Sequence, residues 1–224
     1  MTPLTRELGS TSSGPSSRRG YGEQMSIRFV DELEMGFGWI ESESLSRTSH
    51  ALAVEGRVWV IDPIAGEGVE ERVRALGEPA AVIQLLDRHG RDCAALAARL
   101  GVPLHVVPGS LPGAPFRFLP VRRGGWWKEV ALWWPEHRLL VCADALGTVP
   151  FYCAGDEPTG LHPFLRLRPP RALEGLGVEH LLVGHGEGLH GPATGAAVDD
   201  ALRTARRRLP RLLAGLPRVV RRGY

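Results

Sequence analysis

Short apolar runs, each closed by polar or turn-forming residues, dominate the first part of the chain. Apolar runs of this length, separated by turn signals such as Glu55-Gly56, are typical of strands joined in an antiparallel meander. The predicted strands are Ile27–Val30, Gly38–Ile40, Ser49–Val54 and Val58–Ile61.

After Asp62 the pattern changes to an alternation of helices and strands. Gly77 and Pro79 end the first predicted helix, and Asp92 and Gly101 stand at the N-cap and at the C-terminal stop of the second. The predicted elements are a helix over Glu67–Leu76, a buried strand over Ala81–Leu86, a helix over Asp92–Leu100 and a strand over Leu104–Val107.

The second half begins with strands and ends with a basic segment. Residues 151–170 are rich in Pro and Gly and predict a long loop or short helices. Pro210 and Pro217 interrupt the last helical pattern, so a broken helix is expected there. The predicted elements are strands over Phe116–Val121, Glu129–Trp134, Leu139–Cys142 and Glu179–Val183, a short helix over Ala172–Leu176, and the broken helix over Val198–Val220.

Composition and charge divide the 224 residues into three parts. Residues 1–24 have too little apolar surface to offset their ordering entropy, so we expect a disordered tail. Residues 25–197 should form one domain, and residues 198–224 a basic, partly helical tail. Residues 199–224 hold eight Arg and two Asp, which leaves 19 basic and 23 acidic residues elsewhere.

The composition also indicates the cellular compartment of the protein. Three cysteines are too few for a disulfide framework and indicate a reducing, cytoplasmic location. No window approaches the roughly 18 apolar residues of a membrane-spanning helix. The N-terminus lacks the basic-then-apolar order of a signal peptide.

Chemically active residue types recur where predicted strands end. Asp92 and Cys93 follow the strand that closes at Leu86, Asp144 follows Cys142 and Ala143, and His185 follows Val183-Gly184. Strand ends hold side chains firmly enough to build a site. Oxygen, sulfur and nitrogen donors of this kind could surround one zinc ion.

The order of these motifs resembles that of the metallo-β-lactamase superfamily over residues 26–191. The resemblance implies an α/β fold of the four-layer αββα type with a metal site at one edge. It rests on the meander and on three motifs: Arg91-Asp92-Cys93, the segment from Pro135-Glu136-His137-Arg138 to Asp144-Ala145-Leu146, and Val183-Gly184-His185-Gly186.

Carried over to this sequence, the family pattern is only partly kept. Asp92 corresponds to the Asp of the His-x-His-x-Asp-His loop, Asp144 to the bridging Asp and His185 to the final His. The ligands of the first metal are replaced, with Arg88, Gly90 and Cys93 at the three loop His positions and Gly125 near the later His. The resemblance therefore implies at most one zinc per chain, held by Asp92, Cys93 and His185 with Asp144 nearby.

Arg88 allows two interpretations of such a pocket. A guanidinium cannot ligate a cation, so it could replace the missing metal charge and hold an anionic group of the substrate. Alternatively, Arg88 pairs with Asp92 or Asp144 in a pocket without metal, because buried carboxylates need a partner.

Other assignments of the loop stay open. An alternative ligand set uses Asp87, His89 and Asp92, although we expect His89 to point outward. Cys93 could pack as a buried thiol, or could form a thiolate at the helix N-terminus beside an arginine.

Aromatic and basic residues complete the candidate chemistry. Trp133 is expected to pack within the sheet. Trp126, Trp127 and His162 could line the pocket and contact substrate. The basic tail is expected to be solvated, and contact of Arg206–Arg208 with nucleic acid or anionic lipid is the alternative.

Two functions follow from these observations. In the first, the protein is a mononuclear zinc-dependent hydrolase in which Asp144 orients a water and Arg88 holds a small anionic substrate. In the second, it is a catalytically inactive module with a metal-free, Arg88-containing pocket for an anionic ligand or a protein partner. The sequence specifies neither the substrate nor the oligomeric state.

Overall fold

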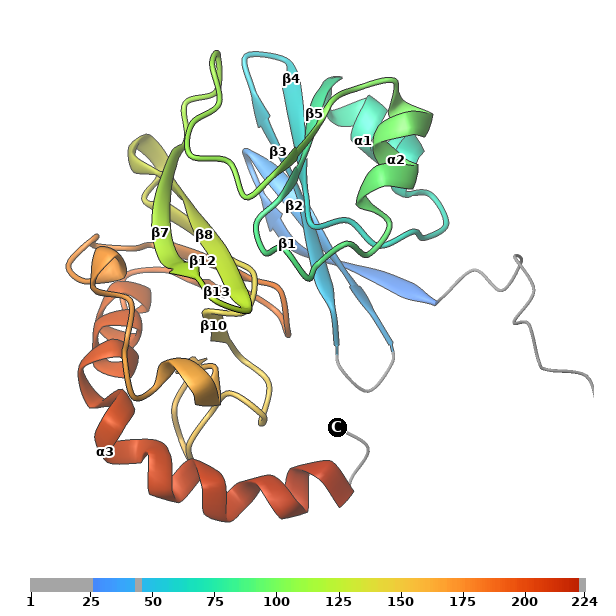
Figure 1. Cartoon of the computed structure of the whole chain (residues 1–224). Coiled ribbons are helices and arrows are strands. Elements are labelled where there is room, and N and C mark those ends of the chain that lie inside the picture. Colours follow the sequence, from blue (N-terminus) through green and yellow to red (C-terminus); the bar gives the residue numbers. More distant parts are fainter. Residues whose placement is uncertain (1–25, 43–45, 222–224) are drawn as a thin grey trace, which may run out of the picture.

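The computed structural model describes residues 26–42 and 46–221, so the predicted disordered tail over residues 1–24 lies outside the described residues. Two β-sheets lie face to face. Helices α1 and α2 cover the outer face of the first sheet, and α3 lies outside the second (Figure 1). This four-layer αββα sandwich is the predicted fold class.

The first sheet has six strands in the order β1-β2-β3-β4-β5-β6. Its first four strands pair antiparallel, which confirms the predicted meander, and β5 and β6 then add in parallel. The strands are β1 (Ile27–Leu33), β2 (Gly36–Glu41), β3 (Thr48–Val54), β4 (Arg57–Ile61), β5 (Glu78–Gln84) and β6 (Leu104–Val106).

Two helices connect the parallel strands of this sheet. Helix α1 (Val69–Leu76) joins β4 to β5, and α2 (Cys93–Leu100) joins β5 to β6. Gly101 ends α2 in the left-handed conformation and donates to the last carbonyl groups of the helix, as the sequence predicted.

The second sheet has the order β13-β12-β9-β8-β7. Strands β9 and β12 pair in parallel, and the other neighbouring strands pair antiparallel. The strands are β7 (Arg117–Gly124), β8 (Trp127–Trp134), β9 (Leu139–Cys142), β12 (His180–Val183) and β13 (Leu189–His190).

Short elements occupy the loops around this sheet. The segment predicted as a long loop or short helices contains one strand of a two-stranded sheet and one 3-10 turn. The two elements within that segment are β11 (Gly160–Leu161) and the 3-10 turn Pro163–Leu165. The other short elements around the sheet are β10 (Leu146–Gly147), which pairs with β11, and the 3-10 turns Pro135–His137 and Arg171–Leu173.

The main core lies between the two sheets. Leu52 and Ile83 of the first sheet and Leu132 and Leu140 of the second are fully buried there. Trp133 is also buried, so its predicted packing role is confirmed. A second apolar cluster lies between the first sheet and helices α1 and α2.

The predicted break in the C-terminal helix is wrong. Helix α3 runs without interruption from Thr194 to Arg221, with Pro210 and Pro217 inside it, and it bends along its length (Figure 1). Proline removes a single hydrogen bond and kinks a helix, and packing elsewhere along the helix can offset that cost. Buried Val198, Ala201 and Leu202 supply this packing, and the predicted boundary at residue 198 falls within the helix.

Helix α3 is also joined to the loop segment by a buried carboxylate. Glu157 accepts hydrogen bonds from Arg166, which is fully buried, and pairs with Arg208 of α3 at 3.1 Å. Because Glu157 and Arg166 are both removed from water, the carboxylate requires its arginine partners to stay in place.

Leu132→Ala should lower the free energy of unfolding by about 2–5 kcal/mol, because it leaves a cavity between the two sheets. Leu213→Ala is the matched control, since Leu213 is 50% exposed, and should change stability by less than about 0.5 kcal/mol. Urea denaturation monitored by tryptophan fluorescence measures both values. Equal effects would show that the sheets do not share a close-packed core.

Candidate metal centre

Four strand ends meet at one edge of the sandwich. In the first sheet, Asp62 follows β4 and His89 lies in the loop after β5. In the second sheet, Asp144 follows β9 and His185 follows β12. Since each strand of a parallel pair ends at the same edge of its sheet, these side chains converge where the sheets face one another.

Three donors converge on one oxygen atom. Asp144 Oδ1 lies 3.0 Å from His89 Nε2, 3.2 Å from His185 Nε2 and 3.1 Å from the Tyr152 hydroxyl. One ligand atom from each of His89, Asp144 and His185 lies within 4.8 Å of the others. This group could hold a metal ion through two nitrogen atoms and one oxygen atom.

His89 points inward, so the expectation that it faces solvent is wrong. Its Nδ1 atom lies 3.2 Å from Asp62 Oδ2, and the other Asp62 oxygen accepts from the backbone N–H of Leu85. The Asp62 carboxylate therefore fixes the ring and directs Nε2 toward Asp144. A ligating histidine is commonly oriented by a carboxylate in this way.

Both nitrogen atoms of His89 face carboxylates. Burial and the charge of Arg91 lower the pKa of the His89 imidazole, but the hydrogen bonds to Asp144 and Asp62 outweigh them and raise it above its usual value. The two carboxylates therefore favour the protonated ring, which can donate from both nitrogen atoms.

Asp144 remains ionised despite its burial. Burial raises the pKa of the carboxyl, but the hydrogen bonds from His185 and His89 lower it well below its usual range. Burial and the charge of Asp144 raise the pKa of Tyr152 well above its usual value, so the phenol keeps its proton. The group therefore contains one firmly ionised oxygen ligand.

Glu129 holds the backbone of Asp144 in place. One of its oxygens accepts from the backbone N–H groups of Asp144 and Ala145, and the other accepts from the Trp127 indole. Burial and the nearby charge of Asp144 raise the pKa of Glu129 to about 7. Glu129 thus fixes the backbone that carries Asp144 without touching the metal-ligand group.

Arg91 supplies a fixed positive charge beside the carboxylates. Its guanidinium donates to the carbonyl oxygens of Thr48 and Asp62 in the first sheet and of Gly184 in the second. From the sequence, Arg88 was expected to supply this positive charge.

Arg88 is instead exposed. Its guanidinium lies 4.9 Å from the ring centroid of Trp126 and 4.5 Å from that of Trp127.

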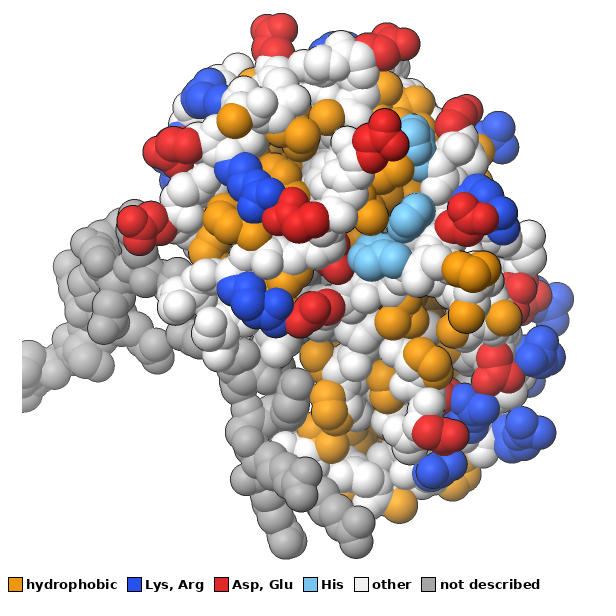
Figure 2. Space-filling view, turned by 180° about the vertical axis from the view of Figure 1, so that it is seen from behind, with side chains coloured by type: hydrophobic (Ala, Val, Ile, Leu, Met, Phe, Trp, Pro, Cys, Tyr) orange, Lys and Arg blue, Asp and Glu red, His pale blue; other side chains and the backbone are white. Residues whose placement is uncertain are grey.

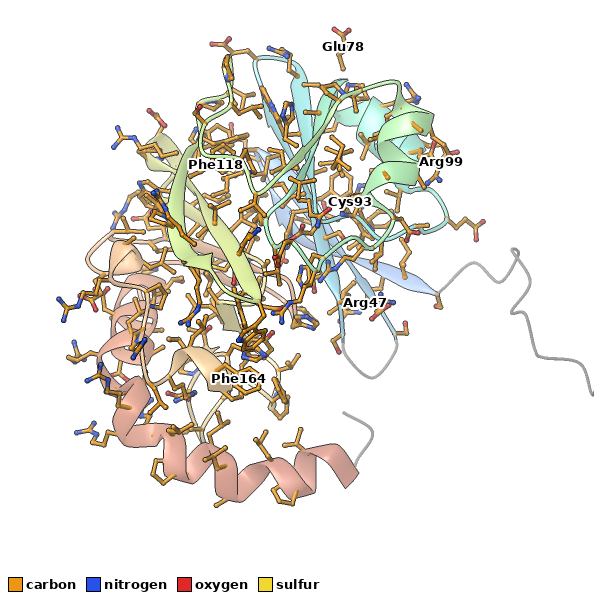
Figure 3. All side chains as sticks on the ribbon, in the orientation of Figure 1. Arg47, Glu78, Cys93, Arg99, Phe118 and Phe164 are labelled. Carbon is orange, nitrogen blue, oxygen red and sulfur yellow. The ribbon has the colours of Figure 1, made fainter. Side chains whose placement is uncertain are left out.

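The structure does not bring Asp92 and Cys93 together with Asp144 and His185. The Asp92 carboxylate accepts from the backbone N–H of Ala65. Cys93 is buried at the start of α2 (Figure 3), in the apolar cluster between the first sheet and the helices. Burial and the charge of Asp62 raise the pKa of its thiol to about 12, so the thiolate considered for this residue is disfavoured.

An aromatic wall stands beside the group. The Tyr152 ring stacks on His185, and His162 contacts Tyr152 and Trp127. Burial lowers the pKa of His162 to about 4, so this ring is neutral at pH 7. Trp126 and Phe164, which are 58% and 66% exposed, form the outer end of the wall.

Sequence analysis missed several members of the site. Asp62 follows an apolar strand as Asp144 does, and this pattern could have identified it. Glu129 and Tyr152 lie within apolar or loop sequence that gives no such signal. Arg91 was considered as part of the motif that contains Asp92 and as a possible partner of a Cys93 thiolate, but not as the fixed cation beside Asp62 and Asp144.

Solved structures that match this fold include metallo-β-lactamases. The match to DIM-1 metallo-β-lactamase has a TM-score of 0.54 and 13% identity, and covers 80% of this chain and 98% of that one. The match to FIM-1 from Pseudomonas aeruginosa in its mono-zinc form has a TM-score of 0.55 and 7% identity, and covers 82% and 97%. VMB-1 matches with a TM-score of 0.52 and 9% identity, over 81% and 99%.

The chain has the metallo-β-lactamase fold. It keeps the fold at an identity too low to transfer an activity. Comparison of the sequence with family models and with curated proteins gives no match. Within the described residues, no helix is long and apolar enough to cross a membrane.

Arg91→Met should destabilise the protein by about 3 kcal/mol or more, because it leaves the buried Asp62 and Asp144 without their fixed cation and frees three carbonyl groups. Arg88→Met removes the same charge from an exposed position and should cost less than about 1 kcal/mol. Chemical denaturation of both variants in the absence of metal compares them. A similar loss in both would remove the special role of Arg91.

His50 of β3 should make the stability of the fold depend on pH. Its buried ring donates from Nε2 to the carbonyl oxygen of Val183 in the other sheet. Burial lowers the pKa of His50 below its usual value of 6.5. The unfolded chain therefore binds the extra proton first, and stability is lost as the pH falls below about 6.5. His50→Gln keeps a donor for Val183 and should reduce this pH dependence.

Urea denaturation between pH 7.5 and 5.5 measures the effect. His105→Gln on β6 is the matched control and should retain the slope of the unaltered protein. Parallel stability curves for the unaltered protein and His50→Gln would contradict the prediction.

Proposed function

We propose that the protein is a hydrolase that uses a single zinc ion held by His89, Asp144 and His185. The observation that carries the proposal is the convergence of these three ligand atoms within 4.8 Å, with the second nitrogen of His89 fixed by Asp62. Zinc in catalytic sites commonly has three protein ligands of this type and one open position.

The charge of the site suits one divalent ion. Asp62 and Asp144 bring two negative charges, and Arg91 offsets part of them. A bound zinc ion would take the place of the protons that His89 and His185 donate to Asp144. When bound, it would lower the pKa of a water molecule and polarise the scissile bond.

The residues around the ligands have separate tasks in this proposal. The Asp144 carboxylate binds and orients water, and the Tyr152 hydroxyl holds that carboxylate in position. Arg88 binds an anionic group of a small substrate, and Trp126 and His162 form the wall against which the substrate packs. Trp127, which the sequence placed in this wall, is 1% exposed and supports it from within. Glu129 and Arg91 position the backbone of the ligand loops.

A competing ligand set contains Asp92 and Cys93 with Asp144 and His185. It requires the Asp92 carboxylate to leave the N–H of Ala65 and the buried Cys93 thiol to lose its proton. We favour the set with His89 because its donor atoms already face one another. The two sets differ in their dependence on His89 and Cys93.

Metal content measured by elemental mass spectrometry tests the proposal. Protein purified without chelators, or reconstituted with zinc, should hold about one zinc per chain. His89→Ala and His185→Ala should lose it, whereas Cys93→Ala and the control His105→Ala should retain it. Zinc should also raise the melting temperature of the unaltered protein, since a ligand of the native state stabilises it.

Two outcomes would overturn parts of this proposal. Loss of zinc in Cys93→Ala with retention in His89→Ala would favour the set with Asp92 and Cys93. Absence of zinc after reconstitution would exclude the zinc-dependent hydrolase mechanism.

A second function is supported by the contacts of Asp144 Oδ1. His89, His185 and Tyr152 already donate to this atom, so the group is hydrogen-bonded without a metal ion. We infer that, if zinc does not bind, the protein acts as a module without catalytic activity. The exposed Arg88 would then hold an anionic ligand or a protein partner against the exposed Trp126.

A further inference from the structure

A second concave region lies away from the candidate metal centre, between α3 and the segment that contains the 3-10 turn Arg171–Leu173. Its cavity has a volume of about 430 Å³. The lining includes Arg168, Arg171, Arg203 and Arg206, together with Glu174 and Leu202. We call this cavity the arginine pocket. Figure 2 shows basic side chains, with acidic ones between them, on the side of the molecule where α3 lies.

The arginines of the pocket are only partly neutralised. Arg203 pairs with Asp200 at 3.0 Å, and Arg206 donates to the carbonyl oxygen of Leu167. Among the described residues, Arg168 and Arg171 have no ion pair with a carboxylate. Because a guanidinium keeps its charge at any usable pH, the pocket carries an excess of positive charge that Glu174 offsets only in part.

The pocket is also held in shape before any ligand binds. The bond from Arg206 to Leu167 ties α3 to the preceding loop, and the backbone N–H of Gly175 donates to Asp199 of α3 at 2.9 Å. Leu202, which lines the pocket, and Leu173 of the neighbouring 3-10 turn are both buried and anchor the two segments in the core. The two segments that carry the guanidinium groups are thereby held beside one hollow.

We propose that the arginine pocket binds a small molecule with a phosphate or diphosphate group. Guanidinium groups match phosphate oxygens in paired hydrogen bonds, which a single ammonium group cannot do. The cavity has the volume of a small-molecule site. Glu174 would repel additional negative charge at one side of the pocket and so fix the orientation of the ligand.

The remaining charges of α3 favour a small anion over nucleic acid. Further along the helix, Arg208 pairs with Glu157 and Asp200, and Arg211 pairs with Asp156. These pairs interrupt the row of free positive charge that a phosphate backbone would need. The guanidinium groups of Arg168 and Arg171 are instead concentrated in the hollow.

Isothermal titration of the full chain with inorganic pyrophosphate tests the proposal. The double variant Arg168→Gln/Arg171→Gln should bind at least about tenfold more weakly, since charge-assisted hydrogen bonds are lost. The control Arg57→Gln/Arg74→Gln removes two exposed arginines elsewhere and should bind within about twofold of the unaltered chain. Melting temperatures verify that both variants fold.

Four results would overturn the proposal. If the unaltered chain binds no pyrophosphate, or if both variants bind it equally weakly, the arginine pocket is not a specific site. Binding that persists in Arg168→Gln/Arg171→Gln would place pyrophosphate elsewhere, for example on a metal ion at His89, Asp144 and His185. Tighter, strongly salt-dependent binding of a single-stranded RNA that pyrophosphate does not displace would identify a nucleic-acid surface instead.

Discussion

The rest of the site depends on the hydrogen bonds that the Arg91 guanidinium donates to both sheets. It binds carbonyl oxygens at the ends of strands from both sheets, and its charge lies beside Asp62 and Asp144. The two sheets also share a core, but the hydrophobic effect that stabilises this core is non-directional. Directional bonds to Thr48, Asp62 and Gly184 fix the strand ends relative to one another.

This constraint determines what the strand ends can do. His89 follows a strand of the first sheet, and Asp144 and His185 follow strands of the second. Their ligand atoms therefore meet only when the two sheets are packed in this relative position. Asp62 and Glu129 then remove the remaining freedom of His89 and of the Asp144 backbone. The donors are thus held together by the protein itself, which would reduce the reorganisation that binding of a metal ion requires.

Sequence reasoning predicted the elements well because their signals are local. The meander, the helix that ends at Gly101 and the strands that end before Asp144 and His185 each depend on apolar runs and turn residues. The inward direction of His89 depends on Asp62, which lies 27 positions earlier in another strand. No periodicity within the loop could reveal that contact.

The same limit explains the other differences. Asp92 and Cys93 have the residue types of metal ligands, but the start of α2 directs one to a backbone N–H and the other into an apolar cluster. The prolines of α3 are local helix-breaking signals, and the packing that overcomes them involves the rest of the fold. The local sequence pattern therefore predicted where the strands end. Tertiary contacts determine which of the residues near those ends face the site.

The buried carboxylate of Glu157 connects the C-terminal helix with the centre of the molecule. Arg208 of α3 and Arg166 of the loop share this carboxylate, and Arg166 also donates to the carbonyl oxygen of Tyr152, whose hydroxyl reaches Asp144. A continuous series of contacts therefore runs from α3 through Glu157 and Arg166 to the residue whose hydroxyl bonds Asp144. The C-terminal helix is in this way part of the framework that holds the site, although the contacts that reach Asp144 come from other segments.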